Sequence, residues 1–395
     1  MNPDTSPFTP RQPAAADIFT GREDHIDALL AAVRRAKSGT ITTAWISGER
    51  GIGKTSLAAF AGIAAERNEN ALFAHVPLGG VNSLGEMAKA TYHRVLEASR
   101  DKPWWEIMRQ QFGKRVEEVG MFGMRLRLNL PDSELPDTME FFAEQLAHLA
   151  AKSGKDVLTL VFDDINGIAG ENFFAHGIKS MVDGLTTRKK PVPVCMIFVG
   201  LEERLDAMCK NNPSVARCFD PLMRVQLWQL EESEIFFRGA FKRTGASMDD
   251  IDITLLSSLC GGMPTIAHEI GDAVWRMAND KNITKEQVTS GVLMAMRSIG
   301  ERFLQREVVN ALQGKDYRSI LGKIATKSGV QFTKQELLAP GFLTDNEKKG
   351  LANFLKRMRD LGGIISVKGE RGVYRFPSLF HRIYYAREAK WQWLK

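Results

Sequence analysis

Cysteine is scarce in this sequence of 395 residues, which contains four of them. Cys195, Cys209, Cys218 and Cys260 form no CxxC pair, and none has a histidine at the close spacing of a metal site. This argues against a small scaffold held by disulfides and against a zinc-finger motif. The pattern predicts buried, reduced thiols in a cytoplasmic protein.

Long apolar runs are absent as well. No stretch approaches the ~20 apolar residues that a membrane-spanning helix needs, so we expect no membrane partner. The N-terminal stretch MNPDTSPFTPRQPAAA lacks the basic and apolar segments of a signal peptide. Its prolines and small polar residues instead predict a flexible arm over residues 1–17.

Acidic residues are few in the C-terminal part of the chain. The formal net charge is +6. Residues 321–395 hold 15 Lys and Arg against 6 Asp and Glu, whereas the remaining residues hold 38 against 41. The basic excess therefore lies entirely in the C-terminal segment. It indicates an acidic partner for that segment, with nucleic acid as the first candidate.

Short apolar runs alternate with helical patterns through the first half of the chain. Four runs are typical of strands, at residues 41–47, 71–77, 157–162 and 194–199. Strands that alternate with helices predict an α/β fold with a doubly wound parallel sheet. Between residues 231 and 282 the pattern becomes helical throughout.

The stretch between residues 83 and 150 is mostly helical, with one interruption. Over residues 124–130, Leu126, Leu128 and Leu130 alternate with basic and polar residues. This period of two predicts an exposed strand. Two interpretations remain open for it, a sheet edge protected by charge and a binding hairpin.

A phosphate-binding motif follows the first predicted strand and opens an alanine-rich helix. Residues 48–55, GERGIGKT, fit G-x-x-x-x-G-K-[ST] at every position. Its glycines let successive N–H groups point inward, where they and the helix N-terminus bind an anion. Lys54 is expected to reach the β- and γ-phosphates, and Thr55 to ligate Mg²⁺. The predicted nucleotide contacts here are Gly48, Arg50, Gly51, Ile52, Gly53, Lys54, Thr55 and Ser56. The alternative is a glycine turn without function, and the flanking strand and helix argue against it.

A pair of aspartates ends the third predicted strand, in the sequence LVFDD at residues 160–164. Ligands of open α/β sheets bind at the carboxyl ends of the strands, so we expect this pair beside the phosphate loop. Asp163 is the candidate Mg²⁺ ligand, and Asp164 is the candidate to orient and polarise the attacking water. The alternative is a turn-forming, helix-capping pair, which a neighbouring phosphate loop disfavours.

These motifs, in this order, resemble the AAA+/STAND family of P-loop ATPases, closest to the bacterial and archaeal replication-initiator branch. The resemblance covers residues 17–280. It is carried by FTGRE at residues 19–23, the phosphate loop, the aspartate pair and GGMP at residues 261–264. It implies a P-loop NTPase parallel sheet with a helical lid, and ATP and Mg²⁺ as its ligands.

The resemblance also implies roles for residues outside the phosphate loop. Phe19, Gly21 and Arg22 would lie near the adenine, and Pro264 would help the lid to close on the nucleotide. Arg217 occupies a place where the family often has an arginine finger, which completes the site of a neighbouring subunit. A surface salt-bridge residue is an equally good interpretation of Arg217.

Three departures from the family pattern predict slow turnover rather than lost binding. The family's acid pair ends in Glu, whereas Asp164 is one methylene shorter. The fourth strand ends in Gly200-Leu201 instead of a polar residue, with Glu202 and Arg204 as candidate substitutes. The lid helix beside Gly262 has no arginine.

The C-terminal segment predicts three helices, at residues 316–328, 333–338 and 345–361, followed by a β-hairpin over residues 364–376. This order is that of a winged helix, whose third helix enters the DNA major groove when the module binds DNA. The predicted phosphate contacts are Lys356, Arg357, Arg359, Lys368 and Arg371. The alternative is a winged helix that binds protein or closes the lid.

We therefore expect a flexible arm at residues 1–17, a P-loop ATPase domain at 18–228, a helical lid at 229–300 and a winged-helix-like α+β domain at 301–395. The predicted function is ATP hydrolysis coupled to homo-oligomer assembly, DNA contact and recruitment or regulation of an unidentified protein partner. One alternative is a STAND-like signalling or defence switch whose tail binds protein. Another is a nucleotide-binding scaffold with negligible turnover.

Overall fold

The computed structural model describes residues 6–10, 12, 19–100, 102–119, 125–188, 191–312, 314–367 and 369–392. Within them the chain divides into two units. One unit is Gly21–Gln226, and the other joins the described part of Met1–Thr20 to Leu227–Lys395. Each unit has an apolar core of its own.

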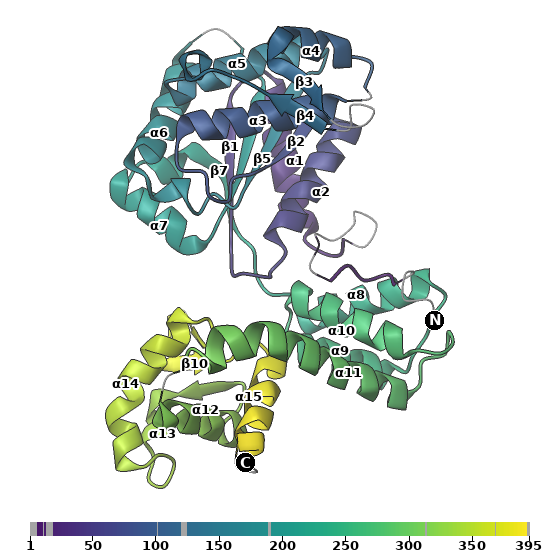
Figure 1. The fold of residues 1–395 in the computed structure, drawn as a ribbon, viewed down its shortest axis with the longest axis vertical. Helices are drawn as coiled ribbons and strands as arrows, with labels where there is room; N and C mark the ends of the chain where they lie inside the picture. The colour runs from purple at the N-terminus through teal and green to yellow at the C-terminus, as the bar shows by residue number, and fades with distance from the viewer. Residues whose placement is uncertain are drawn as a thin grey trace. The chain divides into compact units, whose positions relative to one another are not determined.

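A five-stranded parallel sheet forms the centre of the Gly21–Gln226 unit (Figure 1). Its strands are β1 (Thr42–Ser47), β2 (Ala71–Pro77), β5 (Val157–Asp163), β6 (Val194–Val199) and β7 (Phe219–Arg224). Their order in the sheet is β2-β5-β6-β1-β7. The strand that leads into the phosphate loop and the strand that ends in the aspartate pair thus lie on either side of β6. The predicted doubly wound α/β architecture is confirmed.

Helices cover both faces of this sheet. On one face lie α1 (Glu23–Lys37) and α2 (Lys54–Asn68), and on the other lie α3 (Leu84–Ser99), α5 (Met139–Lys152) and α6 (Asn172–Thr187). The core strands are buried on both sides, which explains why they are continuous apolar runs in the sequence. Phe162 and Phe198 stack within this core with ring centroids 5.2 Å apart.

Strand β7 was not predicted from the sequence. Asp220, Pro221 and Arg224 interrupt its apolar pattern. Because β7 lies at the edge of the sheet, a proline and exposed polar residues are tolerated in it.

A small hairpin lies between α3 and α5. After α4 (Trp105–Phe112), strands β3 (Val116–Val119) and β4 (Arg125–Leu128) pair antiparallel. The predicted strand over residues 124–130 is therefore the second half of a hairpin, with residue 124 outside the described ranges. Leu126 is buried in the core of the unit, and Leu128 and Leu130 pack against that core.

Four helices open the second unit after residue 226. They are α8 (Leu230–Arg243), α9 (Asp250–Cys260), α10 (Pro264–Met277) and α11 (Lys285–Ile299). Phe8, from the predicted arm, is only 3% exposed and packs edge-on against Phe236 and Phe241 of α8. The Thr9 N–H donates to Nδ1 of His268 on α10. Phe8 is thus part of the core of this unit, and the half-buried Thr9 is hydrogen-bonded to α10.

The remaining elements of this unit follow a π-helical stretch over Gly300–Val309. They are α12 (Lys315–Lys327), β8 (Gln331–Thr333), α13 (Lys334–Leu338), α14 (Asp345–Asp360), β9 (Ile365–Ser366), β10 (Val373–Arg375) and α15 (Leu379–Gln392). The three strands form an antiparallel sheet in the order β8-β10-β9. The three predicted helices and the hairpin are confirmed, whereas β8 was not predicted because it has three residues.

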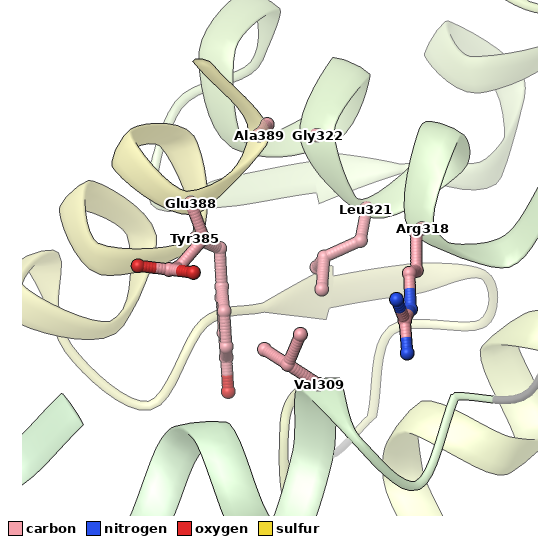
Figure 2. A pocket seen from close by; sticks show the side chains of 7 residues that line it. All are labelled: Val309, Arg318, Leu321, Gly322, Tyr385, Glu388 and Ala389. Atoms are coloured by element: carbon pink, nitrogen blue, oxygen red, sulfur yellow. The ribbon is translucent and has the colours of Figure 1, made fainter. Parts of the chain in front are cut away.

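A small cavity lies between α12, α15 and the end of the π-helical stretch (Figure 2). Tyr385 and Glu388 of α15 line it together with Arg318 and Leu321 of α12 and Val309. Its volume is about 20 Å³, which is room for about one water molecule and no larger ligand.

Two expectations about composition can be compared with the described residues. Cys195 and Cys260 are buried, Cys209 and Cys218 are half-buried, and all four are free thiols. None of the helices in the described ranges has both the length and the apolarity to cross a bilayer.

Candidate functional site

The phosphate loop connects β1 to α2 and has the backbone that the motif requires. Gly48, Gly51 and Gly53 have φ angles of 151°, 77° and 85°. A Cβ at Gly48 would lie 2.9 Å from the carbonyl oxygen of Val225, so no larger residue fits there. Gly53 is the N-cap of α2, a helix of 15 residues, whose first N–H groups open toward the loop. Of the other predicted contacts, Arg50 is exposed, Ile52 is buried and Ser56 is half-buried.

Lys54 is held inside the loop by the loop's own backbone. Its ammonium donates to the carbonyl oxygens of Gly48 at 2.9 Å and Glu49 at 2.8 Å. Burial lowers the pKa of Lys54 to about 8, and the nearby negative charge of Asp163 opposes this shift. The ammonium therefore lies inside the loop. A bound anion would replace the two carbonyl oxygens as its hydrogen-bond acceptor.

Arg22, the N-cap residue of α1, supports the same loop. Its guanidinium donates to the carbonyl oxygens of Ile52 at 2.5 Å and Gly53 at 3.4 Å. Arg22 is 9% exposed and has a left-handed backbone with φ of 66°, next to Gly21 with φ of 71°. The structure thus places Arg22 against the phosphate loop, while Phe19 belongs to the other unit. The resemblance gave a position for Arg22 but not this contact.

Thr55 and Asp163 lie together at the carboxyl edge of the sheet. Asp163 ends β5, and its register partners are Pro77 on β2 and Val199 on β6. Burial alone would raise the pKa of Asp163, but hydrogen bonds from His75 and Thr55 lower it below its usual value. The carboxylate is therefore ionised beside the Thr55 hydroxyl, and both supply the oxygen ligands that Mg²⁺ prefers.

His75 on β2 is a site residue that the sequence did not indicate. Its Nε2 atom lies 3.2 Å from Oδ2 of Asp163. Because an ionised carboxylate only accepts hydrogen bonds, Nε2 is the donor. The only signal in the sequence is that His75 occurs two residues before the end of a strand.

Asp164 is exposed, and its backbone is left-handed with φ of 56°. Its N–H donates to Oδ1 of Asp163 at 3.0 Å, which is the kind of tight turn that aspartate tolerates. One of its own carboxylate oxygens accepts a hydrogen bond from the Asn166 side chain. Left-handed non-glycine residues concentrate at functional sites, and Asp164 is one of three in the described ranges.

The end of β6 lies between the phosphate loop and the aspartate pair. The two candidate substitutes for a polar residue there lie on the helix that follows β6. Glu202 forms an ion pair with Arg224 at 3.0 Å, and Arg204 is exposed on α7 (Glu202–Asn211). The Leu201 N–H instead donates to the Asn166 side chain, another residue that sequence reasoning missed.

Arg217 lies outside this cluster, before the start of β7, and Pro264 belongs to the other unit. Arg217 lies in the 3₁₀ turn Val215–Cys218 and is exposed. Among the described residues no carboxylate pairs with it, so the salt-bridge interpretation gains no support. Pro264 is the first residue of α10, in the other unit, where the Trp228 N–H donates to the Gly262 carbonyl at 3.0 Å.

The predicted nucleic-acid contacts lie on α14 and in the turn before β10. Lys356, Arg357 and Arg359 are exposed on α14, opposite the buried Phe354 and Met358. Arg371 is exposed in the turn, and Lys368 lies outside the described residues. The four predicted contacts that the structure describes are therefore all exposed, three of them on α14 and one in the turn.

Comparisons with known proteins agree with this geometry. Residues 18–197 match a family model described as "AAA ATPase domain". The chain is similar to the Walker-type ATPase PABY2304 of Pyrococcus abyssi, with a TM-score of 0.59 and 13% identity over 98% of this chain and 99% of that one. It is also similar to the ORC2 protein of Aeropyrum pernix in its ADPNP-ADP complexes, with a TM-score of 0.57 and 13% identity over 98% and 97% of the two chains. No curated protein matches the chain in sequence.

These likenesses establish the fold. The parallel sheet with its phosphate loop is the P-loop NTPase fold, as predicted, and residues 18–197 are similar to an AAA ATPase domain. The roles of single residues and the domain boundaries stay predictions.

Proposed function

We propose that this protein binds ATP in the phosphate loop and hydrolyses it, with turnover that is slow for its class. The observation that carries the proposal is one cluster: Lys54 inside a glycine-shaped loop, beside the Asp163 carboxylate, whose pKa the neighbouring Thr55 side chain helps to lower. The similar Aeropyrum pernix ORC2 protein has been solved with ADPNP and ADP, which supports an adenine nucleotide as the ligand.

In the proposed complex, loop N–H groups and Lys54 bind the phosphates. Thr55 and Asp163 would hold Mg²⁺, since their oxygen atoms fit its preference and already lie together. When bound, the ion supplies positive charge that stabilises the β- and γ-phosphate oxygens. Phe19, Gly21 and Pro264 are proposed to contact the rest of the nucleotide, and Arg22 keeps the loop in shape through the Ile52 carbonyl.

For hydrolysis, a water oxygen forms a bond to the γ-phosphorus, and the bond from that phosphorus to the bridging oxygen breaks. Asp164 accepts a hydrogen bond from the water and so orients it for attack. Lys54 stabilises the charge that develops on the departing oxygen. The aspartate side chain reaches less far than the family's glutamate, which is the reason to expect slow turnover.

Arg217 is proposed to act in the site of a second copy. It is exposed and has no acidic partner among the described residues, so its guanidinium is available to a γ-phosphate. Nucleotide binding would then favour self-assembly, because the phosphate links Lys54 of one copy to Arg217 of the next.

The C-terminal elements are proposed to act as a winged helix that contacts DNA. The supporting observation is that Lys356, Arg357 and Arg371 are exposed and lack carboxylate partners within the described ranges. Contacts of this kind are mostly to phosphates and give affinity without strong sequence preference. The competing proposal, a signalling switch whose tail binds protein, uses the same surface and differs in its ligand.

The test of the ATPase proposal compares wild-type protein with Lys54→Ala. We expect magnesium-dependent ATP binding and phosphate release in the wild type and loss of release in the variant. Lys210→Ala is the matched control, because Lys210 is exposed on α7 away from the loop. A wild-type release rate no higher than that of Lys54→Ala would show that the protein is a nucleotide-binding scaffold instead.

A further inference from the structure

Gly200, the residue after β6, contributes no side chain, and buried side chains lie close to its position. A Cβ at Gly200 would lie 3.2 Å from Cγ1 of Ile165 and 3.4 Å from Cζ2 of Trp45, both of which are buried side chains. A polar group at this point of the sheet, between the phosphate loop and Asp163, therefore has to come from another part of the chain.

Asn166 supplies such a group from the loop after β5. Its Oδ1 accepts the Leu201 N–H at 3.2 Å, and its Nδ2 donates to Oδ1 of Asp164. The orientation of the amide is fixed by its partners, because a backbone N–H requires an acceptor and a carboxylate requires a donor. Asn166 thus connects the end of β6 to the side chain of Asp164.

This connection restrains Asp164 at a place where little else does. The Asp164 side chain is exposed, and its Oδ2 lies on the side of Gly79, where a Cβ would be 3.1 Å from it. The left-handed backbone sets where the side chain begins, and the Asn166 hydrogen bond sets where one of its oxygens points. Without the amide donor, the carboxylate would rotate between solvent-exposed positions.

We propose that Asn166 is a positioning residue that holds the Asp164 carboxylate against the end of β6, in the orientation that the attacking water needs. This inference rests on the proposed ATP hydrolysis. Asn166 contacts Asp164 and Leu201, and none of the phosphate-loop residues is among its partners. Its effect is therefore on the chemical step, through kcat, and not on nucleotide affinity.

The test measures kcat and KM for ATP, and the Kd for ADP, in Asn166→Ala and Asn166→Asp. We expect kcat to fall about tenfold or more in both variants while KM and Kd stay within about twofold. Asn166→Asp keeps an acceptor for the Leu201 N–H but removes the donor to Asp164, so it separates positioning from anchoring of the loop. Asn211→Ala is the matched control, since Asn211 bonds the Gly170 carbonyl of the same loop at 3.1 Å without reaching Asp164.

The outcomes distinguish the inference from the function on which it rests. Suppose that the wild type releases phosphate clearly faster than Lys54→Ala. A kcat of Asn166→Asp equal to that of the wild type would then overturn the positioning role and leave the proposed ATP hydrolysis standing. A wild type no faster than Lys54→Ala would overturn both proposals. If Asn166→Ala loses ADP affinity through misfolding, the result is taken from Asn166→Asp. A lower kcat with an unchanged Kd for ADP supports the positioning role, and an equal loss of kcat and of ADP affinity overturns it.

Discussion

His75 and Asp163 come from neighbouring parallel strands and meet through one hydrogen bond, with Nε2 3.2 Å from Oδ2. The other carboxylate oxygen of Asp163, Oδ1, accepts a hydrogen bond from the Asp164 N–H. Both oxygens of the proposed metal ligand are thus restrained before any ion binds, and groups that orient metal ligands affect metal affinity.

We predict that His75→Ala raises the Mg²⁺ concentration needed for half-maximal ATPase activity by about tenfold, because Asp163 loses its orienting donor. His75→Gln should recover much of the loss, since the glutamine amide can donate from a similar position. A magnesium titration of phosphate release gives the result. The exposed His176→Ala serves as control, and the same titration curve in His75→Ala and wild type would show that the bond has no functional effect.

The lowered pKa of Lys54 predicts that ATP affinity depends on pH. Its pKa of about 8 in the free protein means that the ammonium form declines as the pH rises above that value. The phosphates require the ammonium, so the Kd for ATP should rise above pH 8, by up to about tenfold per pH unit. Below that pH the group is already charged, and its protonation adds no further dependence.

Lys54→Arg provides the comparison for this titration, because a guanidinium stays charged over the whole range. Calorimetry at constant magnesium between pH 7 and pH 9.5 would follow both proteins. If the Kd for ATP rises with pH in the same way in the wild type and in Lys54→Arg, the pH dependence does not come from the Lys54 ammonium.

Arg217→Ala should lower phosphate release by about a hundredfold or more if the guanidinium acts as a finger, and should leave ADP affinity unchanged. Mixing it with Lys54→Ala tests whether Arg217 acts on a second copy. The Arg217→Ala protein keeps Lys54, and the Lys54→Ala protein keeps Arg217. A mixed assembly therefore contains some sites in which one copy supplies Lys54 and its neighbour supplies Arg217. Recovery of activity on mixing supports action between copies, and its absence in mixtures shown to assemble argues against it.

Neutralising the α14 cations tests the proposed DNA contact. The triple change of Lys356, Arg357 and Arg359 to Ala should weaken binding to duplex DNA and reduce the slope of log affinity against log salt by about 0.9 per lost phosphate contact. A matched triple change of Lys210, Lys242 and Lys285, which are exposed on other helices, controls for net charge. Equal effects of the two triples, with nucleotide binding intact, would favour a tail that binds protein.

The central sheet and the phosphate site were predictable because each depends on local pattern. Continuous apolar runs marked β1, β2, β5 and β6, and the carboxyl ends of parallel strands necessarily meet at one edge. The neighbourhood of Thr55 and Asp163 follows from those two facts alone. Edge strand β7 escaped notice because Pro221 and its exposed residues remove the apolar signal.

Contacts that depend on strand register were beyond the sequence. His75 reaches Asp163 because β2 pairs with β5 so that Pro77 lies opposite Asp163, and nothing in either segment shows this register. Asn166 in the loop after β5 accepts the Leu201 N–H, although the two residues are 35 positions apart in the sequence. Likewise, the polar composition around Phe8 gave no sign that this side chain is buried.

The burial of Phe8 has a consequence for how the protein is made. The Thr9 N–H and its acceptor on His268 are 259 positions apart in the chain. A ribosome adding about 5–20 residues each second needs on the order of ten to fifty seconds to cover that distance. The segment around Phe8 therefore leaves the ribosome well before the helices that receive it, and during that interval another binder, such as a chaperone, has access to the phenylalanine.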